Sequence, residues 1–245
     1  MKPFSDYANR DEYRKAISQK LVCWRTEHRE TELFVCARER LETEAYNAVV
    51  QLRAVLDDYI KRHPHFGSSL LPVEPLRDAP SVVADMCRAG KAAGVGPMAA
   101  VAGAFAAHVG QDLLLYTSEV VVENGGDVFM KTEEQRTVGI YAGSSPVSMK
   151  LGIVVDSCET PVAVCTSSGT VGPSLSFGCA DAAVVVSHDA YLADACATRL
   201  GNEIRSAADI SRALNMIAAI PGVTGAVAVV GEACGAVGDI RLKAL

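Results

Sequence analysis

The spacing of apolar residues changes along the chain, and each spacing predicts a type of element. Short runs rich in β-branched and aromatic residues at 20–26 and 31–37, joined by a polar turn, predict a β-hairpin. Apolar residues recur every three or four positions over 43–62, which predicts an amphipathic helix. Three prolines interrupt the chain at 62–77, so we expect a loop there, followed by a helix over 81–92.

The motif Gly94-Val95-Gly96-Pro97 predicts the start of another helix, over 98–109, because proline suits the first helical turn. Several small residues share one face of this helix and permit another backbone to come close: Ala99, Ala102, Gly103 and Ala106.

The remainder of the chain is predicted to contain mostly strands, followed by two helices. Strands are expected at 120–123, 127–130, 137–141, 147–155, 162–166, 182–187, 225–230 and 240–243. Helices are expected at 188–203 and 206–219. Helices grouped around a run of strands favour the α+β fold class over regular βαβ winding.

Composition and charge narrow the choice of partner. Hydrophobic residues make up 49% of the 245 positions, which excludes a disordered chain. Residues 1–80 carry 13 basic and 13 acidic residues, whereas 81–245 carry 10 and 16, so the net charge of −6 lies in the second part. This charge-poor, acidic part offers no surface for a polyanion, and nucleic acid is excluded as a partner.

The sequence also indicates a compartment and a state for the cysteines. The first twenty residues lack the apolar core of a signal peptide, so we expect a cytoplasmic protein. The uncharged stretches 92–111 and 213–231 are rich in Ala and Gly, which predicts interior elements and no membrane span. Eight cysteines form no Cys-x-x-Cys pair, so we expect reduced, mostly buried thiols and no zinc or iron–sulfur site.

The first candidate for chemistry is the motif Glu123-Asn124-Gly125-Gly126-Asp127, at the end of a predicted strand. Two glycines there permit positive φ and the close approach of a ligand to backbone amides, with the Asp127 carboxylate beside the opening. An ordinary Asn-Gly hairpin turn with a solvent-facing Asp127 explains the same pattern.

The second candidate is Thr166-Ser167-Ser168-Gly169-Thr170, which also follows an apolar strand. Small hydroxyl groups and a glycine in a compact loop suit a phosphate or a ribose. The chain has neither a Gly-Lys-Ser/Thr phosphate loop nor a Gly-x-Ser-x-Gly elbow, so a serine hydrolase is disfavoured. A plain polar turn is the alternative.

The third candidate is the pair Asp194 and Thr198, which lie four residues apart and therefore on one face of a helix. A carboxylate and a hydroxyl placed in this way suit a hard cation such as magnesium, which prefers oxygen ligands. The alternative is an Asp stabilised by the helix dipole, with Thr198 bonded to the backbone.

Taken together and in this order, the three motifs resemble those of the ApbE-type flavin transferases, which are magnesium-dependent FAD:protein FMN transferases. The resemblance covers roughly residues 90–203. It is closer to a small, largely uncharacterised ApbE-like family, marked by Gly-Pro-Met-Ala-Ala-Val-Ala-Gly at 96–103 and by Glu-Asn-Gly-Gly-Asp at 123–127.

This resemblance implies an α+β, ApbE-like fold with antiparallel or mixed sheets covered by helices, with two similar halves as one option. It implies a single domain over 1–245, in which 1–80 is a charged N-terminal hairpin and helix and 81–245 holds the ligand site. FAD or a related adenine nucleotide would be the ligand and Mg²⁺ the cation, with Asp194 and Thr198 as metal ligands. The FAD site would be lined by two segments: Asn124, Gly125, Gly126 and Asp127, and Thr166, Ser167, Ser168 and Gly169. A homodimer is one option for its assembly.

One segment departs from the transferase pattern. The transferases carry His-x-x-Asp-Pro-x-Thr-Gly between the second and third motifs, whereas the interval here, 171–181, has no His and no Asp-Pro, and its only acid is Asp181. The sequence therefore leaves open a magnesium-dependent, FAD-utilising transferase or hydrolase, and a non-catalytic nucleotide-binding or assembly subunit. A third option is sulfur assimilation, in which Cys165 or Cys179 would take part.

Overall fold

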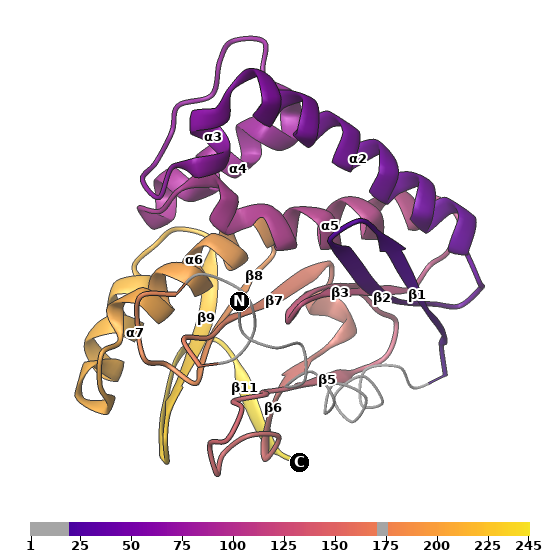
Figure 1. Ribbon diagram of the computed structural model, residues 1–245. Coiled ribbons are helices and arrows are strands. Elements are labelled where there is room, and N and C mark those ends of the chain that lie inside the picture. Colours follow the sequence, from indigo (N-terminus) through magenta and orange to yellow (C-terminus); the bar gives the residue numbers. More distant parts are fainter. Residues whose placement is uncertain (1–19, 171–175) are drawn as a thin grey trace.

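The computed structural model describes residues 20–170 and 176–245 (Figure 1). The two antiparallel sheets are stacked as layers. One face of the larger sheet packs against the smaller sheet, and the helices cover its other face. The larger sheet has eight strands in the order β1-β2-β3-β4-β7-β8-β9-β10, and the smaller has three, in the order β11-β6-β5. The predicted α+β class with antiparallel sheets is confirmed.

The strands of the larger sheet are β1 (Val22–His28), β2 (Thr31–Ala37), β3 (Val120–Asn124), β4 (Asp127–Lys131), β7 (Val162–Ser167), β8 (Ala182–Ser187), β9 (Val223–Val230) and β10 (Ala233–Gly238). Those of the smaller sheet are β5 (Arg136–Gly139), β6 (Leu151–Val155) and β11 (Arg241–Ala244). The α-helices are α2 (Glu42–Arg62), α3 (Pro64–Ser68), α4 (Ser81–Ala93), α5 (Val101–Leu113), α6 (Ala190–Glu203) and α7 (Ile210–Ala218).

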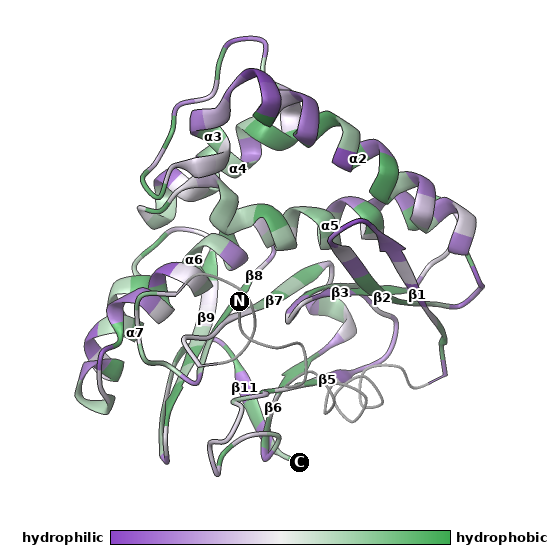
Figure 2. Ribbon diagram, viewed as in Figure 1, coloured by the Kyte–Doolittle hydropathy of each residue, from purple (hydrophilic) through white to green (hydrophobic). Residues whose placement is uncertain are grey.

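The larger sheet is buried on both faces. Successive side chains of a strand point to opposite faces, so along β8 Ala183 and Val185 pack with the helices while Val184 and Val186 pack with the smaller sheet. This explains why the central strands are continuous apolar runs. In Figure 2, β7 and β9 are largely hydrophobic, whereas α2 alternates between hydrophilic and hydrophobic residues along its length.

Most predicted elements are confirmed, and four predictions were wrong in part. The strand expected at 147–155 begins only at Leu151, because 147–150 form a turn, and the helix expected at 206–219 begins as a 3₁₀ turn, η4 (Ala207–Asp209), before α7. The loop expected at 62–77 contains the short helix α3, which begins at Pro64, because proline fits the first helical position. The helix expected over 98–109 begins as a 3₁₀ turn, η2 (Pro97–Ala100), and continues as α5. Strand β10 was not predicted, because its Ala and Gly residues carry little apolar signal and alternate side chains are exposed.

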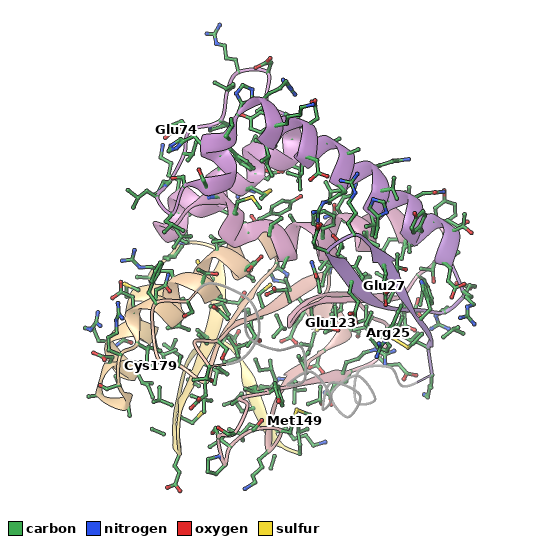
Figure 3. The ribbon with its side chains drawn as sticks, viewed as in Figure 1. Arg25, Glu27, Glu74, Glu123, Met149 and Cys179 are labelled. Carbon is green, nitrogen blue, oxygen red and sulfur yellow. A yellow bond between two sulfur atoms is a disulfide. The ribbon has the colours of Figure 1, made fainter. Side chains whose placement is uncertain are left out.

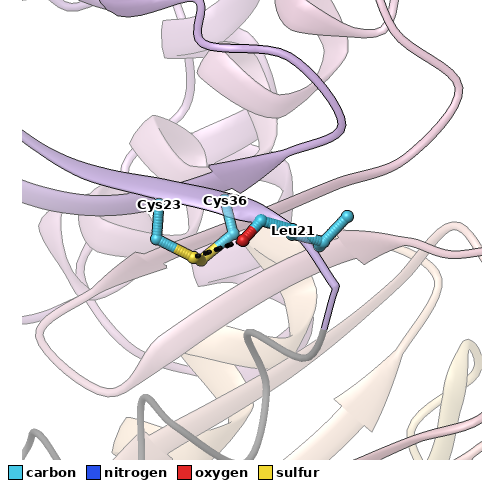
Figure 4. Close-up of a disulfide and its surroundings, with 3 residues drawn as sticks. All are labelled: Leu21, Cys23 and Cys36. Atoms are coloured by element: carbon cyan, nitrogen blue, oxygen red, sulfur yellow. Dashed lines mark hydrogen bonds between the residues drawn. A yellow bond between two sulfur atoms is a disulfide. The ribbon is translucent and has the colours of Figure 1, made fainter.

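The cysteines correct another expectation. Cys23 and Cys36 lie directly opposite each other in β1 and β2 and form a disulfide (Figure 4), so they are not reduced thiols. Of the other six, Cys87, Cys165 and Cys196 are buried as expected, whereas three are exposed: Cys158, Cys179 and Cys234.

The uncharged stretches lie inside the fold. Within residues 20–170 and 176–245, none of the helices alone has the length and apolar character needed to cross a membrane. Helix α4 and the η2–α5 segment meet that test only as a pair, and they are bent by 104° at the break between them.

Candidate functional site

Helices α5 and α6 cross closely, and the crossing fixes the position of Asp194. The backbone N–H of Gly103 donates to Oδ2 of Asp194 at 2.8 Å. A Cβ atom on Gly103 would lie 2.4 Å from the carbonyl oxygen of Ala190, which is too close for any side chain. The small-residue face predicted for α5 therefore permits the contact. The N-terminus of α6 is capped by Asp189, whose Oδ1 accepts from Tyr191 and Leu192, so Asp194 is not needed as the cap.

The first motif is the turn between β3 and β4. Gly125 and Gly126 have φ values of 68° and 114°, as a two-residue hairpin loop favours. The turn is held by side chains: Gly126 N–H donates to Oε1 of Glu123 at 3.0 Å, and Asn124 Nδ2 donates to the carbonyl of Ala102 at 3.1 Å. Glu123 is buried among the strands (Figure 3). The hairpin interpretation is thus correct for the backbone of this motif.

Asp127 itself is not the solvent-facing residue of that interpretation. It is only 7% exposed, and its Oδ1 accepts the backbone N–H of Thr166 at 3.2 Å. This bond links the first motif to the second, at the end of the neighbouring strand β7. The two motifs are therefore adjacent in space although they are 39 residues apart in the sequence.

A cavity of about 360 Å³ lies where these motifs meet α5 and α6. Its polar lining consists of Ser69, Asp127, Thr166, Ser167, Asp194, Thr198 and Asn202. Five of these seven residues were predicted. The other predicted residues lie outside the lining: Asn124, Gly125, Gly126, Ser168 and Gly169. Ser168 and Gly169 stabilise the local turn, since Ser168 Oγ accepts from Thr170 N–H and Gly169 N–H donates to the carbonyl of Ala180.

Sequence reasoning missed two polar residues of the lining, Ser69 and Asn202. Asn202 lies four residues after Thr198, which itself lies four after Asp194, so these three share one face of α6. The recurrence of a polar residue at 194, 198 and 202, every fourth position of one helix, was the signal that could have identified Asn202.

Burial is the main reason why the pKa values of Asp194 and Cys165 are raised. Burial first, and then the charge of Asp127, raises the pKa of Asp194 well above its ordinary value, and the N–H groups of Gly103 and Ala102 offset only part of this. Burial and the same carboxylates also raise the pKa of Cys165. Its thiol points to the carbonyl of Ala190 at 3.8 Å and stays protonated, so it is not a nucleophile.

Asp181, the single acid of the departing segment, has structural partners. Its Oδ1 accepts from Thr170 Oγ1 at 3.0 Å and its Oδ2 accepts from Gly231 N–H at 2.7 Å. Across the described part of the chain, no group of three or more His, Cys, Asp and Glu side chains is arranged to hold a metal. A cation in this cavity would depend on two carboxylates together with hydroxyl, carbonyl or ligand oxygens.

Comparison with known proteins places the chain in a family. A family model described as AbpE bacteria matches residues 14–236. The chain belongs to this family. Named relatives of this AbpE-type chain are UPF0280 proteins. That of Methanocella arvoryzae is 44% identical over 205 residues, 83% of each chain. That of Methanosarcina acetivorans is 39% identical over 215 residues, 86% of this chain and 85% of the relative.

Solved structures agree on the fold. The apo form of the flavinyl transferase ApbE from Pseudomonas stutzeri superposes with a TM-score of 0.55 at 11% identity, over 89% of this chain and 94% of that one. The flavin transferase ApbE from Vibrio cholerae gives 0.54 at 10% identity, over 91% and 96%. The resemblance predicted from the motifs is confirmed, and the AbpE-family chain has the ApbE flavin-transferase fold.

Proposed function

We propose that this chain binds FAD or a related adenine nucleotide, together with Mg²⁺, in the cavity between α5, α6 and the ends of β4 and β7. The observation that carries the proposal is the pair Asp127 and Asp194. Both are buried and both line one cavity, beside the hydroxyl-bearing residues Thr166, Ser167 and Thr198. Two carboxylates in a shared, poorly solvated site repel each other, and a bound cation would remove that repulsion.

The chemistry of the lining fits magnesium. Mg²⁺ takes oxygen ligands and is commonly held by one or two carboxylates together with the phosphates of its substrate. Asp194 and Thr198 would hold it from one face of α6, with a backbone carbonyl nearby and with Asp127 supplying negative charge from β4. When bound, the cation would neutralise the diphosphate, which an acidic protein otherwise repels.

The size and remaining lining of the cavity suit a nucleotide. A volume of about 360 Å³ lies within the range of ligand pockets, roughly 300–1,000 Å³. The backbone and hydroxyls of Thr166 and Ser167 would orient the phosphates at the end of β7. This supports binding of the nucleotide, whether or not the chain then transfers or hydrolyses it.

A second candidate is a non-catalytic nucleotide-binding or assembly subunit. It is favoured by Asp181, which is engaged in two structural hydrogen bonds, so the segment that replaces His-x-x-Asp-Pro has no free acid in its described part. Cys165 does not support the sulfur-assimilation alternative, because its thiol is buried and protonated.

Titration calorimetry tests the proposal with FAD, FMN and ADP, each with and without MgCl₂. We expect FAD and ADP to bind in a Mg²⁺-dependent manner and FMN, which lacks a diphosphate, to bind more weakly. Asp194→Ala should abolish the Mg²⁺ dependence. Asp112→Ala is the control, because Asp112 is an exposed carboxylate on α5 outside the cavity lining.

Absence of binding by the wild type, or binding that Asp194→Ala leaves unchanged, would contradict the proposal. Chromatography of the same FAD mixtures separates the two candidate functions. Release of AMP in the presence of Mg²⁺, with the FMN group passing to water or to an added acceptor protein, indicates a hydrolase or a transferase. FAD that stays intact with both acceptors present indicates the non-catalytic subunit.

A further inference from the structure

Two large apolar side chains stand at the cavity and remain open to solvent. Leu70 is 57% exposed and Phe177 is 47% exposed, and both line the cavity whose polar part holds Asp127 and Asp194. They come from different segments, the connection between α3 and α4 and the connection between β7 and β8. Scattered exposed apolar residues are ordinary, but these two line one cavity together with Val95, Met98 and Val101, which indicates an apolar subsite beside the carboxylates.

The backbone that carries Phe177 is fixed on the C-terminal end of α6. Its N–H donates to Oδ1 of Asn202 at 2.9 Å, and its carbonyl accepts from the guanidinium of Arg205. The next residue, Gly178, is pressed against the helix, because a Cβ atom there would lie 1.8 Å from the carbonyl oxygen of Gly201. Cys179, labelled in Figure 3, continues the contact by donating its N–H to the carbonyl of Ile204 at 2.8 Å. The Phe177 ring is therefore exposed on a backbone that is held on both sides.

The segment that carries Leu70 is fixed in a similar way. Ser69 N–H donates to the carbonyl of His65 at 2.9 Å, and Ser69 Oγ donates to the carbonyl of Leu71 at 2.8 Å. The carbonyl oxygen of Ser69 lies against Gly96, where a Cβ atom would approach it to 1.9 Å. Leu70 is thus attached to the start of η2, beside the cavity.

We infer that Leu70 and Phe177 form the ring subsite of this cavity, which receives the planar aromatic heterocycle of the ligand. This inference rests on the proposed function and names the part of the nucleotide that each end of the cavity recognises. The carboxylates and hydroxyls face the diphosphate and its cation, while Phe177 and Leu70 contact the flat, poorly hydrated ring. Side chains carried on a backbone that is fixed before binding lose less conformational entropy when a ring packs on them.

The subsite also gives a role to the segment that departs from the transferase pattern. Phe177 lies within that segment, and its backbone partner Asn202 belongs to the same α6 face as Asp194 and Thr198. Asn202 is therefore a positioning residue for Phe177, and α6 connects the cation end of the cavity to the ring end.

The test compares ligands with and without a ring on the same variants. Phe177→Ala should weaken Mg²⁺-dependent FAD and ADP binding about tenfold, because stacking of a base on one aromatic side chain commonly contributes that much. Leu70→Ala should weaken the same binding, because it removes apolar surface that the ring would cover. Binding of magnesium pyrophosphate, which has no ring, should not change. Tyr116→Ala and Leu115→Ala are matched controls: these residues are 62% and 79% exposed at the end of α5, outside the cavity lining.

A spectroscopic variant provides an independent readout. In Phe177→Trp the affinity for FAD should be kept, and the fluorescence of the new Trp should be quenched when FAD binds. The only native Trp, Trp24, is buried in β1 and supplies a constant background.

The outcomes separate this inference from the function on which it rests. If magnesium pyrophosphate and FAD bind and Phe177→Ala changes neither, the ring subsite is wrong and the proposed function stands. Equal loss of FAD and pyrophosphate binding in folded Phe177→Ala also overturns the subsite, since it would mean a general disturbance. If neither ligand binds to the wild type, both conclusions fail. Circular dichroism melts establish that each variant is folded.

Discussion

Asp194 is buried on α6, with its Oδ2 held by the N–H of Gly103 and with Asp127 close to it. Burial and the neighbouring charge raise its pKa, so the ionised form is disfavoured in the native protein. A carboxyl whose pKa is higher in the folded than in the unfolded state lowers stability once the pH exceeds the unfolded value. The group best suited to a cation therefore opposes folding in the absence of ligand.

We expect Asp194→Asn to raise the free energy of unfolding of the ligand-free protein at pH 8, by on the order of 1 kcal/mol. Between the ordinary pKa of Asp and the raised native pKa, the wild type loses stability as the pH rises, whereas the variant does not titrate there. The advantage of the variant should therefore shrink as the pH is lowered. Urea denaturation at several pH values measures it, and Asp112→Asn, an exposed carboxylate, should show no such trend.

At the scale of single residues, the sequence predicted which residues line the cavity better than it predicted which residues contact one another. Asp127, Thr166, Ser167, Asp194 and Thr198 were predicted and line one cavity. Phe177 was not predicted, because an isolated Phe has no recognisable spacing until the fold brings it to the site. Asn202 was not predicted although it continues the four-residue spacing of Asp194 and Thr198. Asn124 was predicted as a ligand residue, and in the structure its side chain holds the β3–β4 turn to α5, a contact 22 residues away that no local pattern reveals.

At the scale of elements, the crossing of α5 and α6 sets the geometry of the cavity. Helices pack at interaxial distances of about 8–10 Å, and the separation depends on the side chains at the contact. Gly103 has no room for a side chain, whereas Gly201 on α6 does: the nearest atom to a Cβ there would be Ser167 Oγ at 3.5 Å, an ordinary contact. The two helical glycines therefore differ in function although they are equivalent in sequence terms.

Gly103→Ala should lower the free energy of unfolding by about 1–3 kcal/mol, because the added methyl overpacks the α5–α6 contact. It should also weaken magnesium pyrophosphate binding, since it displaces the backbone donor of Asp194. Gly201→Ala should be neutral or stabilising by up to about 1 kcal/mol, owing to the higher helix propensity of Ala. Thermal melts measure the stability of the two variants, and calorimetry measures their pyrophosphate binding. Equal effects of Gly103→Ala and Gly201→Ala would contradict the conclusion that the α5–α6 crossing sets the geometry of the cavity.

The elements themselves were largely predictable because most have a strong local period. Helix α2 was expected at 43–62 and is found at Glu42–Arg62, since its apolar residues are spaced for one buried face. The η2 turn and β10 were harder to predict, because Ala- and Gly-rich segments carry a weak periodic signal. Their conformation is decided by the elements packed against them.

At the scale of the whole molecule, strand order is what the sequence did not reveal. Strand β4 pairs with β7, so the chain leaves the larger sheet after Lys131, forms β5 and β6 of the smaller sheet, and returns at Val162. The smaller sheet is joined by β11, which pairs with β6 from far along the chain. Such pairings depend on which faces need covering, and no local pattern encodes them.

The state of all eight cysteines can be counted in one experiment. In the native protein we expect the exposed Cys158, Cys179 and Cys234 to react quickly with a thiol reagent, and the buried Cys87, Cys165 and Cys196 to react only on unfolding. Because Cys23 and Cys36 form a disulfide, the unfolded, unreduced chain should show six thiols, and eight after reduction.

The variant Cys23→Ala is the control for this count. It frees Cys36, so the unfolded, unreduced variant should show one thiol more than the wild type. Eight thiols in the unfolded wild type without reductant would contradict the disulfide.

The bend of 104° between α4 and the η2–α5 segment has a consequence for synthesis of the chain. In the folded protein, α5 packs against β3, β4 and α6, and these three elements are all made later. At about 5–20 residues per second, the ribosome needs roughly 5 to 20 s to complete the rest of the core after Leu113. During that interval residues 92–111, an uncharged stretch of twenty residues, have only earlier-made elements such as α2 and α4 to pack against, so we expect a chaperone to bind there.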